Sequence, residues 1–177
     1  MIITFLGTAA ANAFPEAFCR CQNCEQARML GGPSLRKRSA ALINDDLLID
    51  LGPDIMSASH IHGCSLHDVR YCLQIHPHAD HLDLSHLLSR SPDYGVVGAP
   101  VLNVYASRET SERAAETFER DLADYSFLSP EAEKRLNFKM HQIQPFQILC
   151  RRGRQQSPSP VPRLSRQGNI CSANHAI

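Results

Sequence analysis

The sequence predicts an α/β domain in which helices pack against a sheet of short strands. Short apolar runs recur along the chain at the length of buried strands. Amphipathic stretches of helical length lie between several of these runs. Gly, Pro, Asn and Asp residues stand where the runs end, as is typical of turns.

The first half of the chain carries four apolar runs that we interpret as strands. Gly7 ends the first run, and Gly52-Pro53 breaks the third. The turn-forming residues Asn44-Asp45-Asp46 join the second and third runs into a hairpin. Gly31-Gly32-Pro33 stops a helix that precedes the hairpin. The predicted strands are 2–6, 40–43, 47–51 and 69–75, and the predicted helices are 25–30 and 54–68.

The second half alternates between helical and extended patterns. Leucines recur at helical spacing directly after the fourth strand. Ser107 is a preferred N-cap residue before a long charged stretch, and Pro130 stands at an early helical position. The predicted helices are 82–89, 107–125 and 130–136, and the predicted strands are 101–106 and 137–143.

One stretch, His76-Pro77-His78-Ala79-Asp80-His81, concentrates metal-ligand side chains. His76 and His78 face the same side, because side chains two apart in an extended segment share a face. Asp80 and His81 follow where the chain must bend, so they can converge on the same space. Imidazoles and a carboxylate suit Zn²⁺, Mn²⁺ or Fe²⁺. A lone histidine would favour a surface loop without metal, but four ligand types at this spacing favour a metal site.

A second group of candidate ligands is Cys19, Cys21 and Cys24, in a polar loop before the first helix. The chain has seven cysteines, an odd number, and such a cluster in a chain without a secretory signal favours metal binding over disulfides. Three thiolates at this spacing can wrap one Zn²⁺ if a fourth ligand comes from elsewhere. The alternative is three free thiols at the surface.

The pattern H-x-H-x-D-H at residues 76–81 resembles the signature of the metallo-β-lactamase superfamily of hydrolases. Phe5-Leu6-Gly7-Thr8 and residues 47–52 are similar to the ends of that family's first two conserved strands. The cysteine cluster resembles the branch that contains phosphoribosyl 1,2-cyclic phosphodiesterase, in which such cysteines hold a structural zinc. The resemblance covers residues 1–147. It implies an αββα sandwich, of which this chain would hold the N-terminal half and a little more.

The resemblance also implies a function: a metal-dependent hydrolase, specifically a phosphodiesterase acting on a small cyclic phosphodiester. Two divalent metals, Zn²⁺ or else Mn²⁺, would activate water and clamp phosphate oxygens. His76 and His78 would bind the first metal, and Asp80 and His81 the second. Asp80 would also orient the attacking water and is therefore the expected catalytic residue. Asp50 would be a structural residue beside the site.

The last part of the chain departs from the family. The final 28 residues carry five Arg and no acidic residue, although the whole chain is neutral. Pro, Ser, Gln and Arg without apolar periodicity predict a disordered basic tail over residues 148–177. Such a tail is a basic arm, a plain flexible terminus or the product of out-of-frame translation. The abrupt loss of acidic residues and the use of Arg without Lys favour the third explanation.

The family's remaining ligands, which follow further strands, cannot be matched here. They are a third His of the first site, a bridging Asp and a final His, and His175 is the sole histidine after residue 147. A truncated, catalytically inactive product or a noncatalytic metal-binding protein is therefore the alternative to an active hydrolase. We expect this chain by itself to have little or no phosphodiesterase activity.

Length and composition limit the remaining expectations. A chain of 177 residues suggests one domain, here an incomplete one over residues 1–147. No apolar run approaches a membrane span, and the N-terminus lacks a secretory signal, which favours a cytoplasmic protein without a membrane partner. The cluster Arg36-Lys37-Arg38 is most simply a solvated loop, which disfavours nucleic acid. The expected partner is a small-molecule phosphodiester, and a homodimer is compatible with the sequence.

Overall fold

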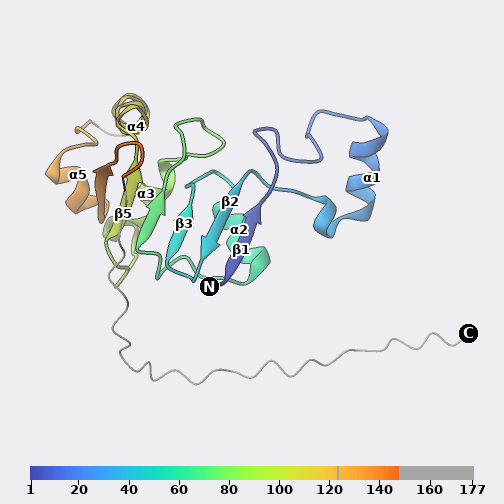
Figure 1. Ribbon diagram of the computed structural model, residues 1–177, viewed down its shortest axis with the longest axis horizontal. Coiled ribbons are helices and arrows are strands. Elements are labelled where there is room, and N and C mark those ends of the chain that lie inside the picture. The colour runs from blue at the N-terminus through green and yellow to red at the C-terminus, as the bar shows by residue number, and fades with distance from the viewer. Residues whose placement is uncertain (123, 148–177) are drawn as a thin grey trace, which may run out of the picture. The chain divides into compact units, whose positions relative to one another are not determined.

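The computed structural model describes residues 1–122 and 124–147 as a mixed α/β domain (Figure 1). The basic tail that the sequence predicts over residues 148–177 lies outside these described residues. The strands are β1 (Ile3–Gly7), β2 (Ala40–Ile43), β3 (Leu47–Ile49), β4 (Tyr71–Leu73), β5 (Leu102–Ala106) and β6 (Phe138–Gln142). The helices are α1 (Gln22–Leu30), α2 (Ile55–His62), α3 (Ser85–Arg90), α4 (Arg108–Asp121) and α5 (Pro130–Arg135), with 3₁₀ turns η1 (Gly32–Ser34) and η2 (Pro92–Tyr94).

The strands form one sheet in the order β1-β2-β3-β4-β5-β6. The first three strands pair antiparallel, whereas β3, β4, β5 and β6 run parallel to one another. The carboxyl ends of these four parallel strands therefore lie at the same edge of the sheet. Segments that follow β3 and β4 along the chain are brought together at that edge.

The β2–β3 hairpin forms where the sequence predicts it. Asn44 and Asp45 adopt φ values of 49° and 63°, the left-handed conformation that tight hairpin turns require. Asn and Asp tolerate this conformation better than most residues with a Cβ. The turn sets a register in which Leu42 lies opposite Leu48, so both side chains point to the same face.

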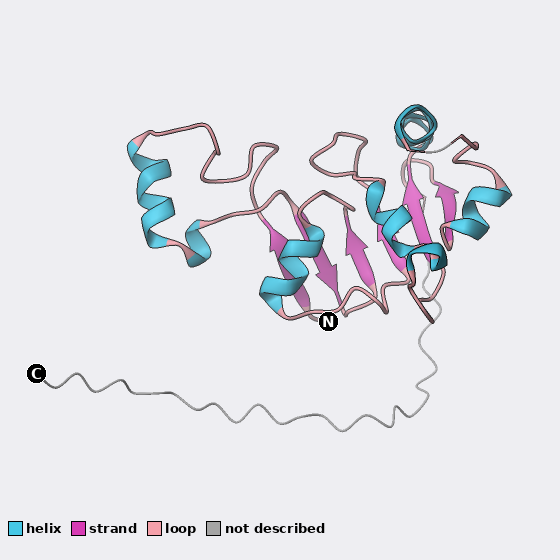
Figure 2. Cartoon of the chain, turned by 180° about the vertical axis from the view of Figure 1, so that it is seen from behind, coloured by secondary structure: helices cyan, strands magenta, loops and turns pink. Residues whose placement is uncertain are grey.

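The core joins the sheet to buried residues of helices α2, α3, α4 and α5. Helices α2 and α3 lie against one face of the sheet (Figure 2). Leu42, Leu48, Cys72 and Val104 form a row across four neighbouring strands and are all buried. Burial raises the pKa of the Cys72 thiol to about 12, so this cysteine stays a neutral core residue.

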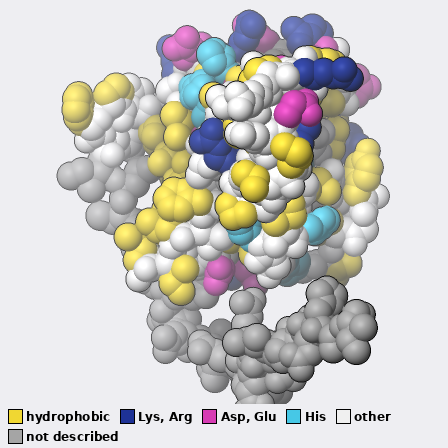
Figure 3. Space-filling view, turned by 90° about the vertical axis from the view of Figure 1, so that its right-hand side faces the viewer, with side chains coloured by type: hydrophobic (Ala, Val, Ile, Leu, Met, Phe, Trp, Pro, Cys, Tyr) yellow, Lys and Arg dark blue, Asp and Glu magenta, His cyan; other side chains and the backbone are white. Residues whose placement is uncertain are grey.

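Apolar side chains also line the opposite face of the sheet. Ile49, Leu73 and Tyr105 lie in register there and are half-buried, and Phe5 at the β1 end is 64% exposed. Apolar residues on both faces are typical of strands that are covered on both sides. Further hydrophobic side chains reach the surface at the α1 end of the domain (Figure 3), among them Phe18 and Met29.

The predicted strands and helices are found in the described residues, but several ends differ. The helix predicted over 54–68 ends at His62, because Gly63 adopts φ 61° and caps it in the left-handed conformation. The strand predicted over 69–75 pairs only over Tyr71–Leu73.

Helix α4 begins as predicted, with Ser107 as its N-cap accepting a hydrogen bond from the Thr110 backbone N–H at 3.1 Å. It ends at Asp121 rather than at residue 125. None of the helices in residues 1–122 and 124–147 is long and apolar enough to cross a membrane.

Candidate metal centre

Residues 76–81, here called the histidine loop, leave the carboxyl end of β4 and turn back sharply. The backbone N–H groups of His81 and Leu82 both donate to the His78 carbonyl, each at 2.9 Å. The chain leaving the loop is then fixed to the end of β3, since the Asp83 N–H donates to the Leu51 carbonyl at 2.7 Å. The turn returns the end of the loop toward its beginning.

This turn brings three of the four predicted ligands together. His76, Asp80 and His81 each offer one ligand atom, and these atoms lie within 4.8 Å of one another. Nε2 of His81 is 3.3 Å from Oδ2 of Asp80, and the rings of His76 and His81 are 3.9 Å apart between centroids. His78 is outside this group, and its ring packs edge-on against His76 at 4.8 Å between centroids. The assignment of His76 with His78 to a first metal and of Asp80 with His81 to a second stays a prediction.

Asp50, the first residue after β3, orients His81 from below the loop. Its carboxylate is fully buried, and Oδ2 lies 2.6 Å from Nδ1 of His81. Oδ1 accepts from the Ile75 backbone N–H at 2.9 Å. Because the Asp50 carboxylate is an acceptor, it favours a proton on Nδ1 of His81. The lone pair of Nε2 would then be free for a cation that Nε2 shares with Asp80.

The donor set fits a divalent transition metal. Two imidazole nitrogens and a carboxylate oxygen make a three-ligand site that leaves coordination positions open, as in catalytic zinc sites. The same donors accept Mn²⁺. His76, Asp80 and His81 are the residues that would hold the ion, with Asp50 supporting His81 from behind.

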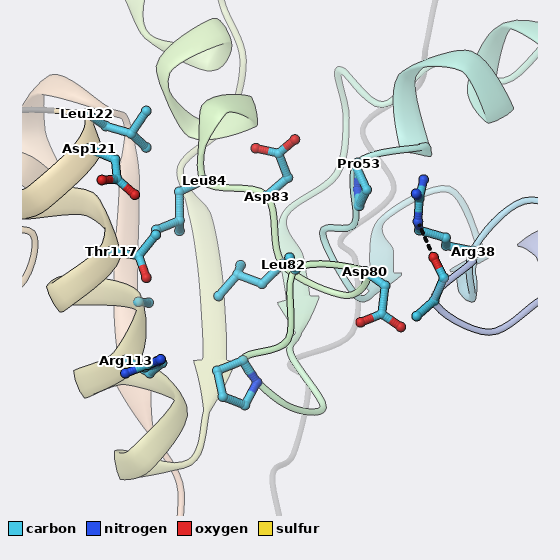
Figure 4. Close-up of a pocket in the computed structure, with 14 residues that line it drawn as sticks. Arg38, Pro53, Asp80, Leu82, Asp83, Leu84, Arg113, Thr117, Asp121 and Leu122 are labelled. Carbon is cyan, nitrogen blue, oxygen red and sulfur yellow. Dashed lines mark hydrogen bonds between the residues drawn. The ribbon is translucent and has the colours of Figure 1, made fainter. Parts of the chain in front are cut away.

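A cleft of about 650 Å³ opens beside the histidine loop (Figure 4). Asp80 and Arg38 line one side of it, and Arg113 and Thr117 of α4 line the other. The guanidinium of Arg38 donates to the Asp54 carboxylate at 3.1 Å, so this partly exposed arginine is held in the wall of the cleft. Residues 36–38 are predicted as a solvated loop, and within that loop the partly exposed Arg38 also has this ion pair. The signal that sequence reasoning missed is that its partner, Asp54, comes directly after a strand-breaking Gly-Pro.

The three cysteines form a second cluster of ligand atoms. The sulfur atoms of Cys19, Cys21 and Cys24 lie within 4.8 Å of one another, and no fourth ligand type joins them in the part of the chain that the structure describes. Arg28 of α1 holds the loop by donating to the Cys19 carbonyl at 2.8 Å. Burial raises the pKa of the Cys24 thiol, whereas hydrogen bonding to the Cys24 backbone lowers the pKa of the exposed Cys21 thiol. The cluster can donate three of the four ligands that a structural zinc requires.

Replacing Cys19, Cys21 and Cys24 together with Ser should lower the zinc content of the purified chain by about one ion. Serine hydroxyls are poor ligands for Zn²⁺, so the cluster would lose its ion while the histidine loop keeps its geometry. Zinc is measured by elemental analysis after dialysis. Cys64→Ser, outside the cluster, serves as the control. An unchanged zinc content in the triple variant would show that these thiols hold no metal.

Comparisons with known proteins agree with this fold. No family model and no curated protein matches the sequence. A diphosphatase from the PhnP family is 20% identical with a TM-score of 0.57, over 80% of this chain and 50% of that protein. Zn²⁺-bound PqqB from Methylobacterium extorquens is 21% identical with a TM-score of 0.55, over 80% of this chain and 45% of PqqB. The metallo-β-lactamase fold protein YhfI from Bacillus subtilis is 19% identical with a TM-score of 0.48, over 84% of this chain and 48% of YhfI.

The chain has the metallo-β-lactamase fold, and the fold expected from the H-x-H-x-D-H pattern is confirmed. Solved structures that are similar to it include the PhnP-family diphosphatase and PqqB. The chain spans about half the length of the solved structures that it matches.

Proposed function

We propose that the histidine loop binds a divalent cation, Zn²⁺ or Mn²⁺, and is the metal centre of a hydrolase of phosphodiesters, small cyclic ones included. One observation carries the proposal. Ligand atoms of His76, Asp80 and His81 lie within 4.8 Å of one another, and the buried Asp50 carboxylate turns the His81 ring so that Nε2 faces Asp80.

Each residue of the site has a defined task in this chemistry. A divalent cation held by these residues would lower the pKa of a water molecule bound to it and would polarise a phosphoryl oxygen of the substrate. Asp80 lines the cleft, so an oxygen of its carboxylate can accept a hydrogen bond from the attacking water and orient it. His81 keeps Nε2 available because Nδ1 donates to Asp50. The cleft beside Asp80 has room for a small phosphodiester.

The PhnP-family likeness supports phosphoryl chemistry, since that structure is described as a diphosphatase. We further propose that this chain alone is a weak or inactive catalyst. The histidine loop gathers three ligand atoms, enough for one ion, whereas two-metal hydrolysis needs a second set. The chain spans about half of the proteins whose fold it shares.

The metal is tested by adding Co²⁺ to the purified chain of residues 1–177 and recording its visible absorption, a direct report of ligand type and number. His76→Ala should abolish the histidine-loop signal and lower the metal content by about one ion, since two protein ligands no longer make a stable site. His60→Ala, on the exposed side of α2, is the control and should leave the signal unchanged. A wild-type chain that binds no more Co²⁺ than His76→Ala would reject the metal site.

Activity is measured on the same protein with bis(p-nitrophenyl) phosphate and added Zn²⁺ or Mn²⁺. We expect turnover close to background. Robust turnover that disappears in both His76→Ala and Asp80→Ala would contradict the inactive assignment, and would place further ligands outside the described residues.

A further inference from the structure

Gln74 is a buried polar side chain at the base of the histidine loop. It follows β4 directly, is 3% exposed, and its backbone N–H donates to the Tyr105 carbonyl of β5 at 2.9 Å. The backbone of Gln74 is thus fixed to the sheet, and its side chain reaches the histidine loop. An uncharged amide buried to this extent needs partners for both its donors and its acceptor.

The amide finds these partners at both ends of the loop. Nε2 donates to the carbonyl of His76 at 3.0 Å and to the carbonyl of His81 at 3.0 Å. Oε1 accepts from the Leu51 backbone N–H at 3.2 Å. Nε2 also lies 3.3 Å from Oδ1 of Asp50. One side chain therefore joins the first and the last residue of the loop to the ends of β3 and β4.

The neighbours fix the orientation of the amide. The Leu51 N–H is solely a donor, while the carbonyls of His76 and His81 are solely acceptors. A flipped amide would place a donor against a donor and an acceptor against two acceptors. Glutamate would fail in the same way, because an ionised carboxylate has no proton to donate.

We propose that Gln74 is a positioning residue that holds the two ends of the histidine loop at the separation which brings His76 and His81 together. This inference rests on the proposed metal site for its functional meaning, but the restraint itself exists in the metal-free chain. The rings of His76 and His81 are 3.9 Å apart between centroids, and the carbonyls of the same two residues share one amide nitrogen. Gln74 thus organises the ligands before an ion arrives.

The test compares Gln74→Met and Gln74→Asn with the wild-type chain. Met keeps the length of the side chain without its hydrogen bonds, and Asn keeps the amide but falls short of the loop. Ser91→Ala is the matched control, since the Ser91 hydroxyl is buried and donates to the Arg135 carbonyl at 2.8 Å, beyond the far end of α3. Far-UV circular dichroism checks that each variant is folded.

Two measurements then test whether Gln74 holds the histidine loop in place. The first is amide hydrogen exchange of Leu82 and Asp83 in the metal-free protein, whose N–H groups donate to His78 and Leu51. Exchange there should accelerate about 10-fold or more in both Gln74 variants, because buried carbonyls lose their partners. The second is Zn²⁺ affinity by competition with a chelating dye, which should fall about 10- to 100-fold. Ser91→Ala should change neither quantity.

The outcomes separate this inference from the proposed function. A wild-type chain that binds no Zn²⁺ at the loop, while exchange at residues 82 and 83 still depends on Gln74, rejects the proposed function and leaves the positioning role standing. Folded Gln74 variants with native exchange and affinity overturn the inference. Loss of fold in both variants overturns it too, because Gln74 would then be a structural residue of the whole domain. Equal effects in Ser91→Ala would likewise reject a specific role.

Discussion

Asp50→Asn should weaken metal binding at the histidine loop about 10- to 100-fold while the chain remains folded. The reason is that the atoms around the residue 50 side chain differ in whether they can donate a hydrogen bond. Oδ1 receives the Ile75 N–H at 2.9 Å, so the asparagine oxygen must occupy that position. The amide nitrogen then faces Nδ1 of His81, where Oδ2 now stands at 2.6 Å. Two donors cannot face each other, so the His81 proton moves to Nε2 and blocks the atom that would bind the ion.

The measurement is Zn²⁺ affinity by dye competition, together with the ¹⁵N chemical shifts of the His81 ring, which identify the protonated nitrogen. Asp54→Asn is the matched control, because Asp54 is a partly buried carboxylate that bonds Arg38 and not the loop. Wild-type affinity in Asp50→Asn, with the proton still on Nδ1, would show that Asp50 does not orient the ligand.

Gly52→Ala should damage the same site from the backbone side. A Cβ at residue 52 would lie 2.6 Å from the Asp80 carbonyl oxygen and 3.6 Å from the His81 Cα, and both are backbone atoms that a side-chain rotation cannot move. The loop must shift to make room. We expect a loss of about 1–3 kcal/mol in the free energy of unfolding and a parallel fall in Zn²⁺ affinity.

Urea unfolding and dye competition measure the two effects of Gly52→Ala. Gly63→Ala is an informative comparison, since residue 63 has φ +61° but a Cβ there meets no atom within 4 Å. That variant should lose stability through backbone strain alone and keep the metal affinity of the wild type. Gly52→Ala with native affinity would mean that the loop yields without moving its ligands.

Local sequence patterns predicted most of the strands and helices. The hairpin turn at residues 44–46 has one main solution, since Asn and Asp tolerate the left-handed conformation that joins two apolar runs. The Ser107 N-cap fixed the start of α4 for the same local reason. The ends that differ depend on tertiary contacts. The predicted strand stops pairing with β5 after the bond from the Gln74 N–H to the Tyr105 carbonyl. The Gln74 side chain and the Ile75 N–H instead bond Asp50.

The candidate metal centre was only partly predictable. Ligand types at residues 76–81 are visible in the sequence because chemistry dictates them. The roles of Gln74 and Gly52 are not visible in the sequence, because each depends on contact with a backbone atom of the histidine loop. A glutamine in an apolar strand directly before the ligands was the available signal for Gln74. Asp50 was expected beside the site through the family resemblance, and its bond to His81 supplies the physical reason.

The strand order has a consequence for how the domain is made. Every strand pairs with the strand just before it in the chain, from β1 to β6. During synthesis from the N-terminus, each new strand can therefore meet an edge that is already present, and none has to await a distant segment. The loop ligands emerge with β4, but the Gln74 N–H finds its acceptor, the Tyr105 carbonyl, only when β5 arrives. The backbone anchor of Gln74 therefore forms about 30 residues of translation after the histidine loop is made, a delay of seconds at about 5–20 residues per second.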